Sequence, residues 1–201
     1  MRLILVLVGI VLVASVLPAR QFSQLESNYA PSNRLAAQVS CENRFFRDAR
    51  AKEITRGPEH EVFLKVVSAF ERRDVPHFYI AEEGNNAAYI AGSLSVDGKG
   101  KIVISRMFAN LLGNTPALEG ILAHEMAHLV SDDGTSGCDQ WILRDPEQEK
   151  AADALAAKTV GYSPLRAFFL RIKEIKPGGS VDLDDRLRAI DALIEMEGKQ
   201  R

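Results

Sequence analysis

The chain has 201 residues, of which 46% are hydrophobic and 26% are charged, and its formal net charge is −2. This length and composition predict one globular domain with a buried core. This charge balance gives no hint of the basic patch that a nucleic-acid-binding protein needs, so we expect no nucleic-acid partner.

The first residues are typical of an export signal. Arg2 gives a positive start, and residues 3–17 then form a run of 15 without a charge. That run is shorter than the roughly 20 apolar residues of a membrane-spanning helix, but it is typical of a secretory signal. We expect residues 1–19 to be either a signal peptide, cleaved after Ala19, or an uncleaved anchor that holds the chain to a membrane through residues 3–17.

Export would place the two cysteines in an oxidising compartment, where a disulfide is permitted. Cys41 and Cys138 offer one pairing within the chain. The alternative is two buried, unpaired thiols. Both alternatives stay open, because the sequence does not show whether their Cα atoms come within bonding reach.

Regular patterns begin after an N-terminal extension. Residues 20–57 are predicted to form this extension, which leans toward helix over 37–56. A helix should begin at Pro58, because hydrophobic residues then recur at helical spacing, and it should end near Arg73. Residues 58–201 are predicted to be a single domain.

Three short runs of β-favouring residues, bounded by Gly and Asn, predict the strands of one small sheet: 77–83, 87–92 and 101–105. Beyond residue 105 the pattern is helical, and three helix starts combine a capping side chain with a proline at the first helical position: Thr115-Pro116, Asp145-Pro146 and Ser163-Pro164. Gly134 and Gly161 are predicted to end the first two of these helices, and a last helix spans about 183–197. This order of elements predicts the α+β class.

The segment ILAHEMAHLV (121–130) contains two histidines four residues apart, with a glutamate directly after the first. On a helix, His124 and His128 lie one turn apart on one face, so both imidazoles can bind one ion. Glu125 neighbours this face and can reach a metal-bound water without being a ligand. The alternative is a pair of core histidines bonded to the backbone, but burial of these groups in an apolar segment favours a metal partner.

A zinc ion that does chemistry needs a third protein ligand, and the candidates downstream of the histidines are seven acidic residues: Asp132, Asp133, Asp139, Asp145, Glu147, Glu149 and Asp153. Glu149 and Asp153 are four residues apart on one predicted helix, so they face the same neighbour. Glu149 can bind the metal, while Asp153 accepts a hydrogen bond from a ligand histidine and orients its ring. Glu147 has Ala151 at the matching position and offers no such pair. The alternative is a solvated acidic helix face.

With these motifs the chain resembles the gluzincin metallopeptidases and, among them, the HtpX-type and CaaX-protease family, metallopeptidase family forty-eight. The family's His-Glu-x-x-His and Glu-x-x-x-Asp motifs match HEMAH (124–128) and EKAAD (149–153). NAAYIAGS (86–93) and VGYSPLRA (160–167) also resemble family segments, and the similarity covers roughly residues 58–195. The resemblance implies a zincin-like domain, in which a small, mainly antiparallel sheet packs on the active-site helix and on further helices.

We therefore expect an exported zinc endopeptidase that acts on unfolded or envelope proteins, in the periplasm or anchored to the inner membrane facing it. Zn²⁺ held by His124, His128 and Glu149 would lower the pKa of its bound water toward about 7, with Glu125 as general base. Its partner would be a protein or peptide substrate. Strand 101–105 could pair with an extended substrate if it lies at a sheet edge.

The sequence leaves alternatives open for the oxyanion-stabilising residue and for the function. Four residues are candidates to stabilise the oxyanion of the reaction: Tyr162, Arg186, His60 and His77. The function also has alternatives, which are a non-catalytic, chaperone-like zinc-binding module of the envelope, or a latent enzyme whose segment 131–141 folds over the metal and is anchored through Cys138. The glutamate at 125 favours an enzyme, because a purely structural zinc site needs no general base.

Overall fold

The computed structural model describes residues 46–82, 91–96, 99–113, 115–131, 146–175 and 181–199. These residues form β1 (Ala51–Glu53), α3 (Pro58–Ala69), β2 (His77–Ala81), β3 (Ala91–Val96), β4 (Lys99–Ser105), α4 (Arg106–Leu112), α5 (Pro116–Val130), α6 (Pro146–Val160), α7 (Tyr162–Ile175) and α8 (Val181–Lys199). All of them belong to one compact unit, which spans residues 36–201. The predicted leader and both cysteines lie outside the described residues. None of the described helices combines the length and apolar character that are needed to cross a bilayer.

The sheet has the strand order β1-β2-β4-β3. β1 is antiparallel to β2, and β3 is antiparallel to β4, whereas β2 and β4 run parallel. The expected small, mainly antiparallel sheet and the α+β class are therefore confirmed. β4 has a neighbour on each side, so residues 101–105 are an internal strand. The expectation that this strand could offer an edge to a substrate was wrong, and β3 occupies that edge instead.

Two predictions around the sheet differ from the structure. The strand expected at 87–92 is observed from Ala91, extends to Val96 and pairs with β4, while residues 87–90 lie outside the described residues. Residues 51–53, expected to lean toward helix, form β1 and pair with β2 in the register Glu53↔Tyr79. In both cases the pairing partner, which local propensity does not contain, decides where the strand lies.

The helix starts at prolines were predicted more closely. α3, α5 and α6 begin at Pro58, Pro116 and Pro146. α3 nevertheless ends at Ala69, earlier than expected. Gly161 follows α6 with φ of 91°, and its N–H donates to the Ala157 carbonyl at 2.9 Å, which confirms the glycine stop.

The remaining helix predictions need correction. The hydroxyl of Thr115 does not cap α5 but donates to the Leu112 carbonyl at 2.5 Å. α5 ends at Val130, before the predicted stop at Gly134, which lies outside the described residues. α7 begins at Tyr162, so Ser163 lies inside its first turn rather than before it. α8 extends two residues beyond the predicted span at each end.

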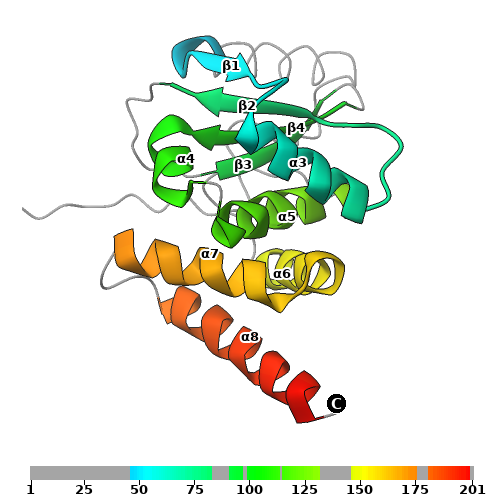
Figure 1. Cartoon of the computed structure of the whole chain (residues 1–201), viewed down its shortest axis with the longest axis vertical. Helices are drawn as coiled ribbons and strands as arrows, with labels where there is room; N and C mark the ends of the chain where they lie inside the picture. Colours follow the sequence, from blue (N-terminus) through cyan, green and yellow to red (C-terminus); the bar gives the residue numbers. More distant parts are fainter. Residues whose placement is uncertain are drawn as a thin grey trace, which may run out of the picture. The chain divides into compact units, whose positions relative to one another are not determined.

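α5 is the central helix of the fold. Figure 1 shows α3 and α5 next to the sheet, with α6 and α7 beyond them and α8 farthest away. Twelve of the 15 residues of α5 are buried, which is typical of a helix surrounded by other elements. On the sheet, Phe78, Ile80, Ile102 and Ile104 form the buried face, and Phe78 stacks on Phe63 of α3. The candidate motif therefore lies in the interior, between the sheet and the later helices.

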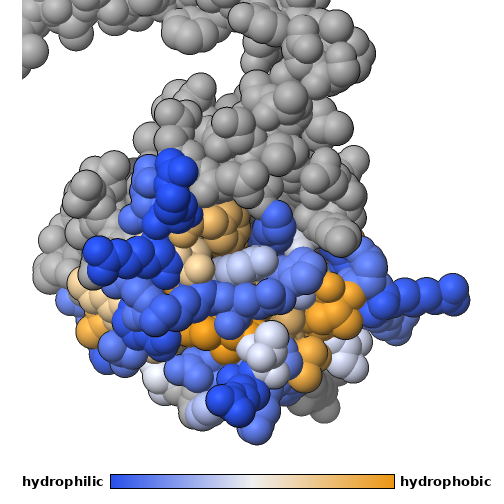
Figure 2. All heavy atoms as spheres, turned by 90° about the horizontal axis from the view of Figure 1, so that it is seen from above, coloured by the Kyte–Doolittle hydropathy of each residue, from blue (hydrophilic) through white to orange (hydrophobic). Residues whose placement is uncertain are grey.

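Hydrophobic side chains on the described surface are scattered. Figure 2 shows mainly hydrophilic side chains on the coloured part of this face, with smaller hydrophobic areas between them. The large hydrophobic residues that are exposed lie on different elements: Leu64, Val75, Met107, Val130 and Met196. Single exposed hydrophobic residues of this kind are normal for a globular protein and do not define a docking surface.

Candidate metal centre

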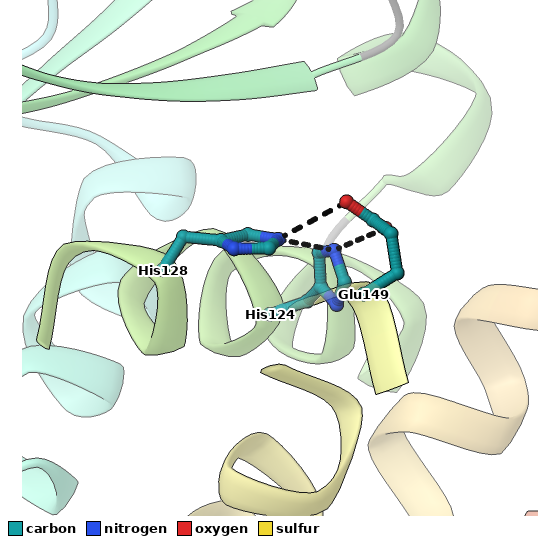
Figure 3. Close-up of side chains that lie close together, drawn as sticks. All are labelled: His124, His128 and Glu149. Carbon is teal, nitrogen blue, oxygen red and sulfur yellow. Dashed lines mark hydrogen bonds and ion pairs between the residues drawn. The ribbon is translucent and has the colours of Figure 1, made fainter. Parts of the chain in front are cut away.

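Three side chains from two helices converge at one point. His124 and His128 come from successive turns of α5, and Glu149 comes from the first turn of α6 (Figure 3). The Nε2 atoms of the two histidines are 3.1 Å apart. Glu149 places Oε2 3.2 Å from His124 Nε2 and Oε1 3.3 Å from His128 Nε2. The potential ligand atoms of the three residues all lie within 4.8 Å of one another.

These separations fit a single divalent cation. Ligand atoms held about 2.0–2.1 Å from a tetrahedral zinc ion lie about 3.3 Å from each other. The observed 3.1, 3.2 and 3.3 Å agree with that value to within a few tenths of an ångström. Two imidazole nitrogens and one carboxylate are also a donor set that zinc accepts. The residues present therefore fit the metal that the sequence predicts.

A fourth residue orients the first histidine. Asp153 lies one turn after Glu149 on α6, and its Oδ1 atom accepts a hydrogen bond from Nδ1 of His124 at 2.8 Å. A proton on Nδ1 leaves the lone pair of Nε2 directed at the cluster, which is the tautomer that a metal ligand requires. Asp153 is buried, so this contact is shielded from water.

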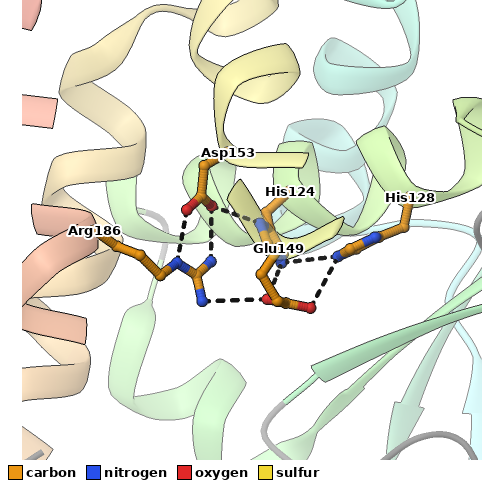
Figure 4. Close-up of polar contacts among 5 residues, drawn as sticks. All are labelled: His124, His128, Glu149, Asp153 and Arg186. Carbon is orange, nitrogen blue, oxygen red and sulfur yellow. Dashed lines mark hydrogen bonds and ion pairs between the residues drawn. The ribbon is translucent and has the colours of Figure 1, made fainter. Parts of the chain in front are cut away.

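Arg186 of α8 joins both carboxylates of α6 (Figure 4). Its Nε donates to Asp153 Oδ2 at 2.6 Å and its Nη2 to Asp153 Oδ1 at 2.8 Å. Nη1 donates to Glu149 Oε2 at 3.2 Å. The guanidinium also lies 4.7 Å from the centre of the Phe169 ring. The sequence placed Arg186 among four oxyanion candidates and missed this contact. Two carboxylates four residues apart on one helix repel each other, and that repulsion was the available signal for a cation.

The charges of the site shift its pKa values. Burial acts to lower the pKa of His124, but hydrogen bonds with Asp153 and Glu149 outweigh burial and raise it to about 9. Burial acts to raise the pKa of Glu149, but hydrogen bonds from both histidines and the charge of Arg186 hold it far below its usual range. The pKa of Asp153 is lowered, since its bonds to His124 and Arg186 likewise outweigh burial. Both carboxylates are therefore ionised and available to a cation.

Glu125 and Glu147 have different surroundings. Glu125 is buried on α5, close enough for its charge to help raise the pKa of His124. Glu147 is exposed, with 77% of its side chain accessible, and pairs with Lys150. The structure thus brings Glu149, and not Glu147, beside the histidines. The other four acidic candidates, Asp132, Asp133, Asp139 and Asp145, lie outside the described residues.

Two of the four oxyanion candidates have partners elsewhere. His77 pairs with Glu53 on the neighbouring strand β1, at 2.6 Å between Nδ1 and Oε1. The His60 ring lies 5.9 Å from that of Phe63, on α3. Tyr162 begins α7 and packs against the core. Among the described contacts of the four, those of Arg186 reach the cluster, and its guanidinium donates to the carboxylates of Asp153 and Glu149.

An α+β domain with His-Glu-x-x-His on a central helix and a glutamate from the next helix has the architecture of a zincin-like metallopeptidase. The family model described as Peptidase family M48 matches residues 55–159, which is 105 of the 201 residues. The chain therefore belongs to peptidase family M48, as its motifs predicted. Neither a curated protein nor a solved structure matches the chain. The matched region ends within α6, so α7, α8 and Arg186 lie beyond it.

Proposed function

We propose that this protein is a zinc endopeptidase that hydrolyses peptide bonds in unfolded or envelope proteins. The observation that carries the proposal is the convergence of His124, His128 and Glu149 at the spacing of one tetrahedral cation. Membership of peptidase family M48 supports a metallopeptidase. We keep export as part of the proposal, through residues 1–19, to the periplasm or to an anchored position facing it.

In the proposed reaction, His124, His128 and Glu149 hold the metal and Asp153 keeps the His124 ring in place. Zinc, when bound, supplies a Lewis acid and lowers the pKa of water. Glu125 accepts a proton from the attacking water and returns it to the leaving amine. Its place in the sequence, directly after one ligand and three residues before the other, puts it in the same helical turn as the site.

The edge strand β3 is the proposed place for an extended substrate. β3 contacts α5, the helix that carries both histidines, and its outer side has no strand partner among the described residues. An extended peptide can add to such an edge through backbone hydrogen bonds. Recognition through the backbone demands an unfolded segment and little particular sequence, which supports unfolded proteins as the substrate class.

Hydrolysis of casein by the full-length chain tests the proposal. We expect cleavage that a chelator abolishes and that zinc restores. Glu125→Gln should retain one equivalent of zinc and lose hydrolysis, whereas Glu147→Gln, which changes an exposed residue, should remain active. No cleavage by a parent protein that binds zinc would instead favour a binding module. Full activity in Glu125→Gln would show that this residue is not the base.

A further inference from the structure

We propose that Arg186 is a positioning residue, which couples the docking of helix α8 to cation binding at the site between α5 and α6. The inference rests on the proposed metal site and adds a third helix to it. That helix lies beyond residues 55–159, which the family model matches. Arg186 donates to both Glu149 and Asp153, and we assign its effect to these two carboxylates.

The two carboxylates of α6 need a cation beside them. Glu149 and Asp153 are one turn apart on α6, with only 18% and 10% of their side chains exposed. Two ionised carboxylates in such a position repel each other and lose hydration. The guanidinium of Arg186, itself 12% exposed, offsets both losses at once because its planar fork supplies donors in fixed directions.

Arg186 and His124 share the oxygen atoms of both carboxylates. A single oxygen, Asp153 Oδ1, accepts from Arg186 Nη2 and from His124 Nδ1, each at 2.8 Å. Glu149 Oε2 lies 3.2 Å from Arg186 Nη1 and 3.2 Å from His124 Nε2. Each carboxylate is thus held between the arginine and the metal site. Arg186 thereby fixes the carboxylate rotamers before a cation arrives, which reduces the entropy cost of binding.

Helix α8 is attached to the rest of the domain mainly through α7. α8 buries Leu183, Leu187 and Ile190, and its main packing partner is α7. Ion pairs join the same two helices at Arg166–Asp191 and Lys173–Asp184. Arg186 extends from this helix pair to α6 (Figure 4). Because equilibrium coupling is reciprocal, an α8 that strengthens cation binding must itself be docked more firmly by the cation.

Zinc affinity, measured by competition with a chromophoric chelator, tests the proposal on the full-length chain. We compare the parent with two variants. Arg186→Met removes both the positive charge and the hydrogen-bond donors of the guanidinium, whereas Arg186→Lys keeps the charge but not the planar arrangement of donors. Both variants should bind zinc about 10- to 100-fold more weakly, the usual effect of losing a group that orients metal ligands. The control is Arg188→Met on the same helix, whose side chain is 72% exposed and pairs with Asp185. It should bind like the parent.

Hydrogen exchange of the α8 amides, with and without zinc, gives a second readout. Zinc should slow this exchange in the parent and in Arg188→Met, and should have little effect on it in Arg186→Met. Equal zinc affinity in parent and both Arg186 variants, or tighter binding in Arg186→Met, would overturn the inference while the proposed function stands. The inference would also be overturned if zinc did not change the exchange rate of the α8 amides in the parent. A parent that binds no zinc would overturn the proposed function together with the inference.

Discussion

Asp153 and His124 are 29 residues apart in the sequence, yet Oδ1 of the aspartate lies 2.8 Å from Nδ1 of the histidine. This contact joins α6 to α5 at the point where both helices present their polar groups. It sets which nitrogen of the imidazole faces Glu149 and His128. This pair therefore connects the His-Glu-x-x-His motif of α5 to the carboxylates of α6, so that residues of both helices form one site.

Asp153→Asn should weaken zinc binding by about 10- to 100-fold, because an amide neither orients the His124 ring nor balances its charge as a carboxylate does. The metal-free protein should also lose about 1.5–3 kcal/mol of unfolding free energy, the usual worth of hydrogen bonds to a charged group. Chelator competition and urea denaturation measure the two effects. Asp185→Asn, at an exposed residue of α8, is the control and should change neither quantity. Parental zinc affinity in Asp153→Asn would contradict the role of Asp153 in orienting His124.

The stability of the metal-free protein should fall as the pH rises from 6.5 to 9. The folded-state pKa of His124, about 9, lies above its ordinary value of 6.5, so the folded protein binds this proton more tightly than the unfolded chain does. The resulting stabilisation is complete below pH 6.5 and is lost as the pH rises through 9. Urea unfolding across this range measures it. Zinc-loaded protein is the control, since the metal would replace the proton, and an equal fall with and without zinc would contradict the assignment.

Gly120→Ala should destabilise the protein, although alanine is the better helix former. A Cβ atom at Gly120 of α5 would lie 2.2 Å from the carbonyl oxygen of Pro164, on α7. The two helices would have to separate, at a cost of about 1–3 kcal/mol for overpacking. Helix propensity alone predicts the opposite sign, a gain of up to about 1 kcal/mol. The sign of the change in urea unfolding therefore distinguishes a close contact of α5 and α7 from a loose one.

The elements that the sequence predicted correctly are those whose ends are set by residues within one helical turn. α5 and α6 begin at the expected prolines, and α6 stops at Gly161, because a fixed φ and a left-handed glycine act within one turn. β1 was missed, and the extension of β3 to Val96 was not predicted, because both depend on pairing with β2 and β4. The strand order that makes β4 internal likewise depends on the whole sheet, and the residues of β4 alone do not indicate it.

In the site, too, local spacing was predictable and the long-range contact was not. The spacing of His124 and His128, and that of Glu149 and Asp153, each predicts a shared helix face, and the structure brings these faces together. Arg186 is 33 residues from Asp153, and its contact depends on how α8 docks on α7. No local pattern near Arg186 indicates which of the many acidic residues it meets.

The most direct test of the metal centre is a zinc titration of the parent, Glu149→Gln and Glu147→Gln, under one set of conditions. We expect one equivalent of tightly bound zinc in the parent and in Glu147→Gln, because Glu147 is exposed and paired with Lys150. We expect a large loss of affinity in Glu149→Gln, because a neutral amide replaces the carboxylate that lies 3.2 and 3.3 Å from the two histidines. Equal affinity in the two variants would contradict the assignment of Glu149 as the third ligand.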